Sequence, residues 1–296
     1  MRILLLALAG LLAACQSQTP ELPLLPAWQA PEAREHADLG VILDLRSGQR
    51  LTPLQLVEQL AAAPRLLVGE QHDNPDHHAL QLWLLRALAA QRPQGSLLLE
   101  MLNPNQQAAV DQVHADYANG QPPADLYQAL AWQANWDWGL YGAIVAYALQ
   151  QPWPLQSANL DRSEIMTIYA APPPLAGRAS TAPAVRAALL EQIRQSHCGL
   201  LPESQLPAML AVQQQRDRRM AEQLHDAPQP ALLLAGAFHV RRDLGVPLHL
   251  QDLGSADGAQ VLLLAEAGQP VTAAEADFVW FTAAQPEQDH CAKLRR

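Results

Sequence analysis

The sequence predicts an α/β protein in which helices flank a central, largely parallel β-sheet. Several short runs of Leu, Val and Ala do not alternate with polar residues, which is typical of strands that are covered on both faces. Segments with helical spacing of apolar residues separate these runs, and this alternation favours a parallel sheet. An apolar content of 49% in 296 residues agrees with a sizeable core.

The expected elements follow in order within a folded domain over residues 36–296. A hairpin-like edge is expected at 41–52. Buried strands are expected at 65–70, 96–102, 152–160, 231–239 and 259–266. Helices are expected at 75–91, 104–118, 124–134, 139–150, 183–196 and 205–225. The proline-rich segment 171–183 is interpreted as a loop, and residues 184–226, which lack strand signals, are expected to form a small helical subdomain.

The N-terminus has the pattern of a lipoprotein signal. Arg2 precedes an apolar run that is too short to span a bilayer, and the tetrapeptide LAAC that ends at Cys15 resembles a bacterial lipobox. We therefore expect residues 1–15 to be a signal peptide ending at a lipidated Cys15, and residues 16–35 to be a flexible tether. Gln16 after the cysteine favours the outer membrane, by resemblance to known sorting signals. Acyl chains would anchor the protein there, facing the periplasm or the surface.

Two further cysteines, Cys198 and Cys291, would lie in an oxidising compartment. We expect them to form a disulfide that ties the chain ahead of the last long helix to the C-terminal tail, with two free thiols as the alternative. Neither cysteine has the Cys-x-x-Cys spacing of a zinc ribbon.

The charge balance argues against a nucleic-acid partner. The formal net charge is −10, Lys293 is the single lysine, and the sequence contains no basic stripe that could neutralise phosphates. Arginine pockets for carboxylates are still compatible with this composition.

The predicted strands end in residues that can carry chemistry. Glu70 and His72 follow the run LLVG, Glu100 ends the run LLLE, and His239 follows LLLAGAF. In open α/β sheets, ligands bind outside the carboxyl ends of the strands. We therefore expect these four side chains, from three segments, to converge at one edge of the sheet.

Two of these segments share the form Gly-x-x-His, at 69–72 and 236–239. Together with Glu100 they resemble the superfamily that joins ChaN-like haem-binding proteins, Tiki/TraB proteins and erythromycin esterases. The resemblance is to the ChaN-like family over about residues 40–250. It rests on the segments GEQHDNPDHH, LLLEML, WDWGLYGAIVAYA, ANLDR, HCGLLP, QQQRDRRMA and AGAFHVRRDLGVP.

This resemblance implies a haem-binding lipoprotein that works with the outer-membrane haem uptake machinery. It also implies ferric haem held between two subunits through a tyrosine, with propionates bound by side chains of the partner. A phenolate suits ferric haem, and Tyr169 and Tyr141 are the tyrosines considered as ligands. His77, His78 and Arg241 are expected to hold propionates.

His77 and His78 also have a purely structural interpretation. Asp73 or Asn74 can cap a helix that starts at Pro75, which places both histidines in its first turn. Glu70 and His72 are not needed for such a cap.

A hydrolase is the alternative function. Glu70 or Glu100 would act as general base, while His72 and His239 would transfer protons. In a metal-dependent version, His72, His239 and Glu100 would bind a divalent ion. Against this reading, no nucleophile elbow and no HExxH motif is present.

The run from Arg216 to Arg219 includes Asp217 and is typical of a solvated helix face. Because this segment carries part of the family resemblance, an inward-pointing Asp217 or Arg218 near the site is the other interpretation.

Overall fold

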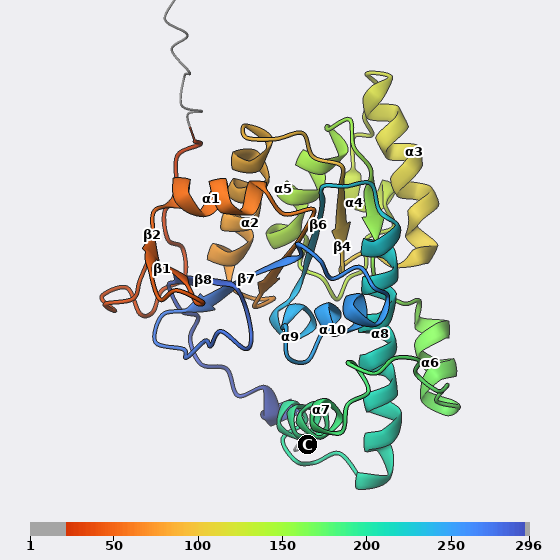
Figure 1. Cartoon of the computed structure of the whole chain (residues 1–296). Helices are drawn as coiled ribbons and strands as arrows, with labels where there is room; N and C mark the ends of the chain where they lie inside the picture. The colour runs from red at the N-terminus through yellow and green to blue at the C-terminus, as the bar shows by residue number, and fades with distance from the viewer. Residues whose placement is uncertain (1–21, 294–296) are drawn as a thin grey trace, which may run out of the picture.

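The computed structural model describes residues 22–293 and has the α/β architecture that the sequence predicts (Figure 1). The predicted signal peptide and Cys15 lie outside the described residues. One eight-stranded sheet has the order β2-β1-β8-β7-β3-β6-β4-β5. The strands are β1 (Ile42–Asp44), β2 (Arg50–Leu51), β3 (Arg65–Glu70), β4 (Ser96–Leu99), β5 (Leu155–Ser157), β6 (Ala231–Gly236), β7 (Gln260–Glu266) and β8 (Phe278–Thr282).

The six strands from β8 to β5 run parallel to one another, while β1 pairs antiparallel with β2 and β8. β6 lies between β3 and β4, with Glu70 opposite Gly236 and Leu99 opposite Leu234. The carboxyl ends of these three strands therefore meet at one edge of the sheet.

Helices cover both faces of the sheet (Figure 1). The α-helices are α1 (Pro53–Ala61), α2 (Pro75–Ala89), α3 (Gln107–Ala118), α4 (Leu126–Ala129), α5 (Trp138–Leu149), α6 (Arg162–Ala170), α7 (Pro183–Ser196), α8 (Leu206–Asp226), α9 (Ala237–Val240) and α10 (Val246–Asp252). Short 3-10 turns occur at Pro104–Gln106, Glu203–Gln205 and His290–Lys293.

Successive residues of the central strands alternate between two apolar cores. Leu66 and Val68 of β3 pack with α1, α2, α3 and α5, whereas Leu67 packs with α8 and α10 on the other face. This two-sided burial explains why the strand runs are continuously apolar. No described helix is long and apolar enough to cross a membrane.

The structure confirms the fold class and also differs from the expected elements. β8, α1, α6 and α10 were not expected, and the strand expected at 231–239 ends at Gly236, where α9 begins. In the segment expected to be a helical subdomain, α7 and the start of α8 enclose a small apolar cluster that includes Leu189 and Leu210. Met220 and Leu224, near the end of α8, pack on the sheet.

Cys198 and Cys291 are joined by a disulfide in the structure. Cys198 directly follows α7, and Cys291 lies in the C-terminal segment after β8. The bond therefore holds that segment against α7, at the bottom of Figure 1.

Residues 22–35 make contacts with the domain, which corrects the expected tether for the part of 16–35 that the structure describes. The Asp76 carboxylate accepts the backbone N–H groups of Gln29, at 2.6 Å, and Ala30, at 3.2 Å. Trp28 packs against the core, and Glu32 forms a β-bridge with Ala284. These contacts join residues far apart in the sequence, so local composition did not reveal them.

We predict that Asp76→Ala releases this segment. The two backbone donors lose a charged acceptor, so the free energy of unfolding should fall by about 2 kcal/mol. Amide hydrogen exchange at Gln29 and Ala30 should become faster. Asp111→Ala, which removes an exposed carboxylate, is the control and should change stability by less than about 0.5 kcal/mol. Unchanged exchange at Ala30 would contradict the docked segment.

Candidate functional site

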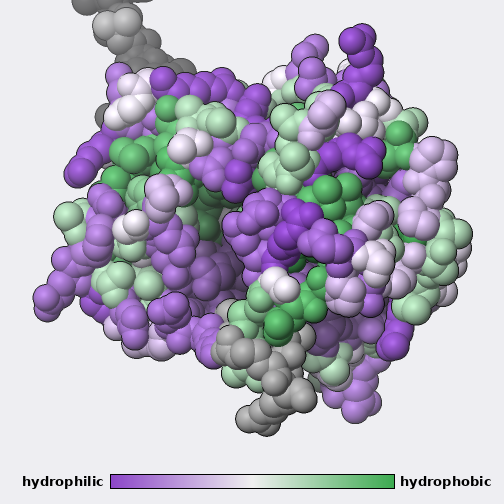
Figure 2. All heavy atoms as spheres, turned by 90° about the horizontal axis from the view of Figure 1, so that it is seen from below, coloured by the Kyte–Doolittle hydropathy of each residue, from purple (hydrophilic) through white to green (hydrophobic). Residues whose placement is uncertain are grey.

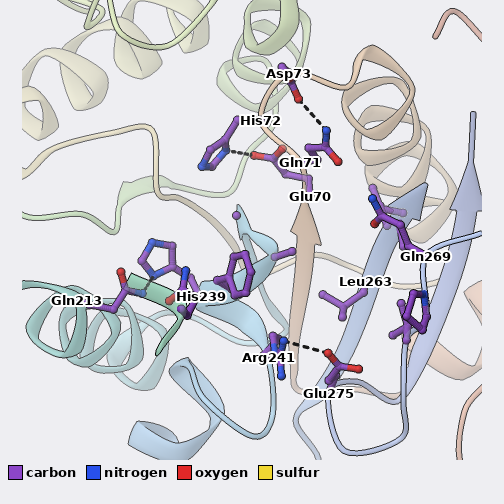
Figure 3. Close-up of a pocket in the computed structure, with 18 residues that line it drawn as sticks. Glu70, Gln71, His72, Asp73, Gln213, His239, Arg241, Leu263, Gln269 and Glu275 are labelled. Carbon is purple, nitrogen blue, oxygen red and sulfur yellow. Dashed lines mark hydrogen bonds and ion pairs between the residues drawn. The ribbon is translucent and has the colours of Figure 1, made fainter. Parts of the chain in front are cut away.

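The carboxyl ends of β3, β4 and β6 bring the predicted cluster together. Glu70 ends β3 and His72 follows it, Glu100 directly follows β4, and His239 lies in α9 immediately after β6. Figure 3 shows Glu70, His72 and His239 around the same pocket. The convergence expected from the strand ends therefore occurs.

Glu70 is held through its Oε1 by two side chains, whereas its buried Oε2 has no hydrogen-bond partner among the described residues. Its Oε1 lies 2.6 Å from His72 Nδ1 and accepts a hydrogen bond of 2.9 Å from the Tyr141 hydroxyl. Its Oε2 lies 3.8 Å from His78 Nε2. Burial lowers the pKa of His72, but the hydrogen bond and charge of Glu70 outweigh burial and raise it. The His72 side chain is 46% exposed, so its ring can meet a ligand.

His239 lies between two buried carboxylates. Its Nε2 is 3.3 Å from Glu100 Oε1, and its Nδ1 is bonded to Asp217. Burial by itself would lower the pKa of His239, but the two carboxylates raise it to about 10. Burial would raise the pKa of Glu100, yet the His239 charge keeps that carboxyl well below its usual range. His239 is therefore an imidazolium at neutral pH.

The backbone also holds Glu100, because the Gly236 N–H donates to its Oε2 at 2.8 Å. The Gln213 side-chain amide of α8 donates to Asp217 Oδ2 at 3.4 Å and lies 3.1 Å from His239 Nδ1. Asp217 is fully buried, so the run from Arg216 to Arg219 is not simply a solvated face. The inward-pointing interpretation of Asp217 is correct, and Gln213 was missed because nothing in the sequence distinguishes it from its neighbours.

The two Gly-x-x-His motifs make room for each other. A Cβ on Gly236 would lie 2.9 Å from His72 Cε1, so the glycine of the second motif admits the histidine of the first. A Cβ on Gly69 would press on Val240 and lie 3.0 Å from Ala237 Cα, on either side of His239. Gly236 has an ordinary φ of −58°, so the glycine is needed for space and not for an unusual backbone conformation.

His77 and His78 are buried and serve the structure. His77 Nδ1 accepts the Gln71 N–H at 2.8 Å, and burial, reinforced by His78, lowers its pKa to about 3. The neutral ring fixes the backbone between Glu70 and His72. His78 Nε2 lies 3.0 Å from the His72 carbonyl oxygen. Asn74 caps α2, and Pro75 lies in its first turn, which confirms the helix cap expected from the sequence.

A cleft of about 840 Å³ opens beside the cluster. Glu70, His72 and His239 line it together with Arg241 and the 47% exposed Phe238. The molecule is hollowed on the face seen in Figure 2, from the side of α7 and α9. Arg241 pairs with two carboxylates, those of Asp243 at 2.7 Å and Glu275 at 2.9 Å.

The predicted metal ligands are not arranged as a metal centre. Among the described residues, no group of three or more His, Cys, Asp or Glu side chains could hold a metal ion. His239 uses both ring nitrogens on carboxylates, which leaves it no lone pair for a metal. The set His72, His239 and Glu100 is thus better suited to proton transfer.

The two tyrosines considered as haem ligands lie in different places. Tyr141 is 1% exposed, and its hydroxyl donates a hydrogen bond to Glu70. Burial and the Glu70 charge raise its pKa, which opposes formation of a phenolate. Tyr169 lies on α6, outside the cleft, and is half-buried. Arg241 lines the cleft, but Tyr169 and the buried His77 and His78 do not.

The fold and site define a class of α/β proteins with paired Gly-x-x-His motifs at the carboxyl edge of a parallel sheet. A family model described as haem-binding uptake, Tiki superfamily, ChaN, matches residues 56–250. The chain therefore belongs to the ChaN haem-binding family. No protein of curated function matches it.

One solved structure supports this assignment. It is ChaN of Campylobacter jejuni, described as binding haem cofacially, with 31% identity over 82% of this chain and 97% of that chain, and a TM-score of 0.74. An effector domain of a Vibrio vulnificus toxin has 13% identity over 84% and 41% of the two chains, with a TM-score of 0.44. An erythromycin esterase mutant has 14% identity over 81% and 80%, with a TM-score of 0.41.

We predict that His239 makes stability depend on pH in the alkaline range. Its pKa is about 10 when folded and 6.5 when unfolded. Its stabilising contribution is therefore complete below pH 6.5 and is lost as pH rises through about 10. Urea unfolding should show a steeper alkaline loss in the unsubstituted protein than in His239→Gln. Parallel pH profiles would contradict the imidazolium.

Proposed function

We propose that this protein binds ferric haem between two copies of the chain. The similarity to ChaN of Campylobacter jejuni, at 31% identity over 82% of this chain, carries the proposal. Membership of a haem-binding family supports it. When bound, ferric haem would supply an iron that a phenolate oxygen can hold.

Tyr169 is better suited than Tyr141 to hold the haem iron. Its hydroxyl makes no hydrogen bond to a described residue, and its side chain is partly open to solvent. Ile165 and the 57% exposed Met166 precede it on α6, and no residue of this helix is fully buried. An apolar surface with an uncommitted phenol suits a flat apolar ligand with a hard metal at its centre.

Arg162 is a second feature of this surface. It begins α6, is exposed and forms no ion pair within residues 22–293. Tyr169 is seven positions after Arg162, so both lie on one face of the helix, about 10 Å apart along its axis. Its guanidinium would hold a propionate there, whereas Arg241 is already neutralised by Asp243 and Glu275.

We further propose that the protein is a lipoprotein anchored in the outer membrane through Cys15, where it passes haem to or from the uptake machinery. The lipobox LAAC supports the anchor. The Cys198–Cys291 disulfide agrees with an oxidising compartment outside the cytoplasm.

The test is a titration of ferric haem into the chain that starts at Gln16, followed by absorbance and sedimentation. We expect saturable binding with a tyrosinate spectrum and a shift from monomer to dimer. Tyr169→Phe should remove the tyrosinate band and weaken binding by about tenfold or more. Tyr127→Phe, at a tyrosine that is also partly exposed, is the matched control. Non-saturable binding, or an unchanged Tyr169→Phe spectrum, would refute the proposal.

A hydrolase is the second candidate, favoured by the geometry of the cleft. His239 is an imidazolium that can donate a proton, and the exposed ring of His72, oriented by Glu70, can accept one. Opposed acid and base groups in one cleft are what general acid–base catalysis requires.

If this candidate is correct, His239→Gln should reduce hydrolysis of activated aryl esters by about 100-fold. Tyr169→Phe should leave the rate unchanged, because α6 lies outside the cleft. Circular dichroism and thermal melting would separate a lost acid from a lost fold. Equal hydrolysis by the parent and His239→Gln would exclude the cluster as a catalytic site.

A further inference from the structure

The segment that enters the domain presents apolar side chains to solvent. Leu24 is 95% exposed and Leu25 is 50% exposed, whereas Leu22 and Trp28 on either side pack against the core. The backbone here is fixed, because the Pro23 carbonyl accepts the Trp83 indole N–H at 2.9 Å and Asp76 binds Gln29. The two leucines are therefore displayed by a docked segment.

The sequence places these leucines close to the proposed lipid anchor. Leu24 is nine residues after Cys15, and an extended chain covers at most about 3.6 Å per residue. Leu24 thus lies within about 32 Å of the lipidated residue, even with the intervening chain fully stretched. A patch of this kind next to an acyl anchor would contact lipid.

The adjoining edge of the sheet is poor in charge. The loops before the parallel strands β3, β4, β5, β6 and β7 all lie at the amino edge, opposite the cleft. These loops are 62–64, 92–95, 150–154, 227–230 and 254–259, and they contain six prolines. Arg92 and Asp257 are the only charged residues of these five loops, although the net charge of the chain is −10. The segment before the sixth parallel strand, β8, carries Glu275 and Asp277, which are paired with Arg241 and with Arg46 and Arg242. Arg92 is turned inward onto the carbonyl groups of Ala61 and Ala63.

We propose that Leu24 and Leu25 insert into the bilayer interface and that the amino edge of the sheet faces the lipid surface. Burial of exposed leucines favours insertion, and an edge with few charges loses little hydration against headgroups. The described chain starts in the upper part of Figure 1, whereas α9 lies below the middle of the view and α7 lies at the bottom. The cleft and the disulfide-held segment therefore point away from the membrane.

The inference rests on the proposed lipidation of Cys15 and is independent of haem binding. The test uses the full-length lipidated protein in vesicles of phosphatidylethanolamine and phosphatidylglycerol. A polarity-sensitive fluorophore is attached at Leu24→Cys, Pro152→Cys or Met166→Cys. The introduced thiol is the one free thiol, because Cys15 is acylated and Cys198 is paired with Cys291. Both Leu24 and Met166 are exposed, so their labels are matched.

Reconstitution should raise the fluorescence at Leu24→Cys by about threefold with a blue shift, and leave Met166→Cys unchanged. The label at Pro152→Cys, at the far end of the amino edge, should be quenched by headgroup-attached nitroxide. A label at position 24 that stays in water, or equal quenching at 152 and 166, would overturn the inference. Mass spectrometry of the N-terminal peptide tests lipidation separately: acylated protein with an aqueous label refutes only the orientation, whereas unacylated protein refutes the anchor as well.

Discussion

The arrangement of the site depends on β6 lying between β3 and β4, with all three strands parallel. This order brings Glu70, Glu100 and His239 to one edge, where helices on both faces exclude water. Buried charges are tolerated only when they are paired. The surroundings therefore supply a partner for each, including Asp217 for His239 and Tyr141 for Glu70. Against the effect of burial, the buried carboxylates raise the pKa of His239 and, through Glu70 and Glu100, that of His72.

Much of this edge was predictable from sequence, because the signal is local. An apolar run that ends in Glu or His identifies both the strand and the side chain at its end, and Glu70, Glu100 and His239 lie as expected. Contacts made across the fold were harder to predict. The rotation of α8 decides that Asp217 faces inward among arginines, and the Glu70 carboxylate gives Tyr141 a structural role. The docking of residues 22–35 depends on Asp76, about 50 positions later.

The two proposed activities use different surfaces. The acid–base cluster lies in the cleft at the carboxyl edge, whereas Tyr169 and Arg162 lie on α6, outside the cleft. Such a separation would let one scaffold keep an inherited cluster while it binds a cofactor elsewhere, since function resides in sites and not in the fold. An ion pair of Glu164 with Arg219 connects α6 to α8. Arg216 lies one turn before Arg219 on α8, and the charge of Arg216 contributes to the lowered pKa of Glu100.

Gly236 leaves space for the His72 ring, and Gly69 leaves space for the residues around His239. This close fit limits how the sequences of related proteins can change at the two motifs. A side chain at Gly236 requires the His72 ring to move, and a side chain at Gly69 requires Val240 and also Leu263 of β7 to move, so the order of mutations matters most at Gly236. A lineage that first lost the ring of His72 would be free to acquire alanine at position 236, whereas the reverse order would pass through a distorted intermediate.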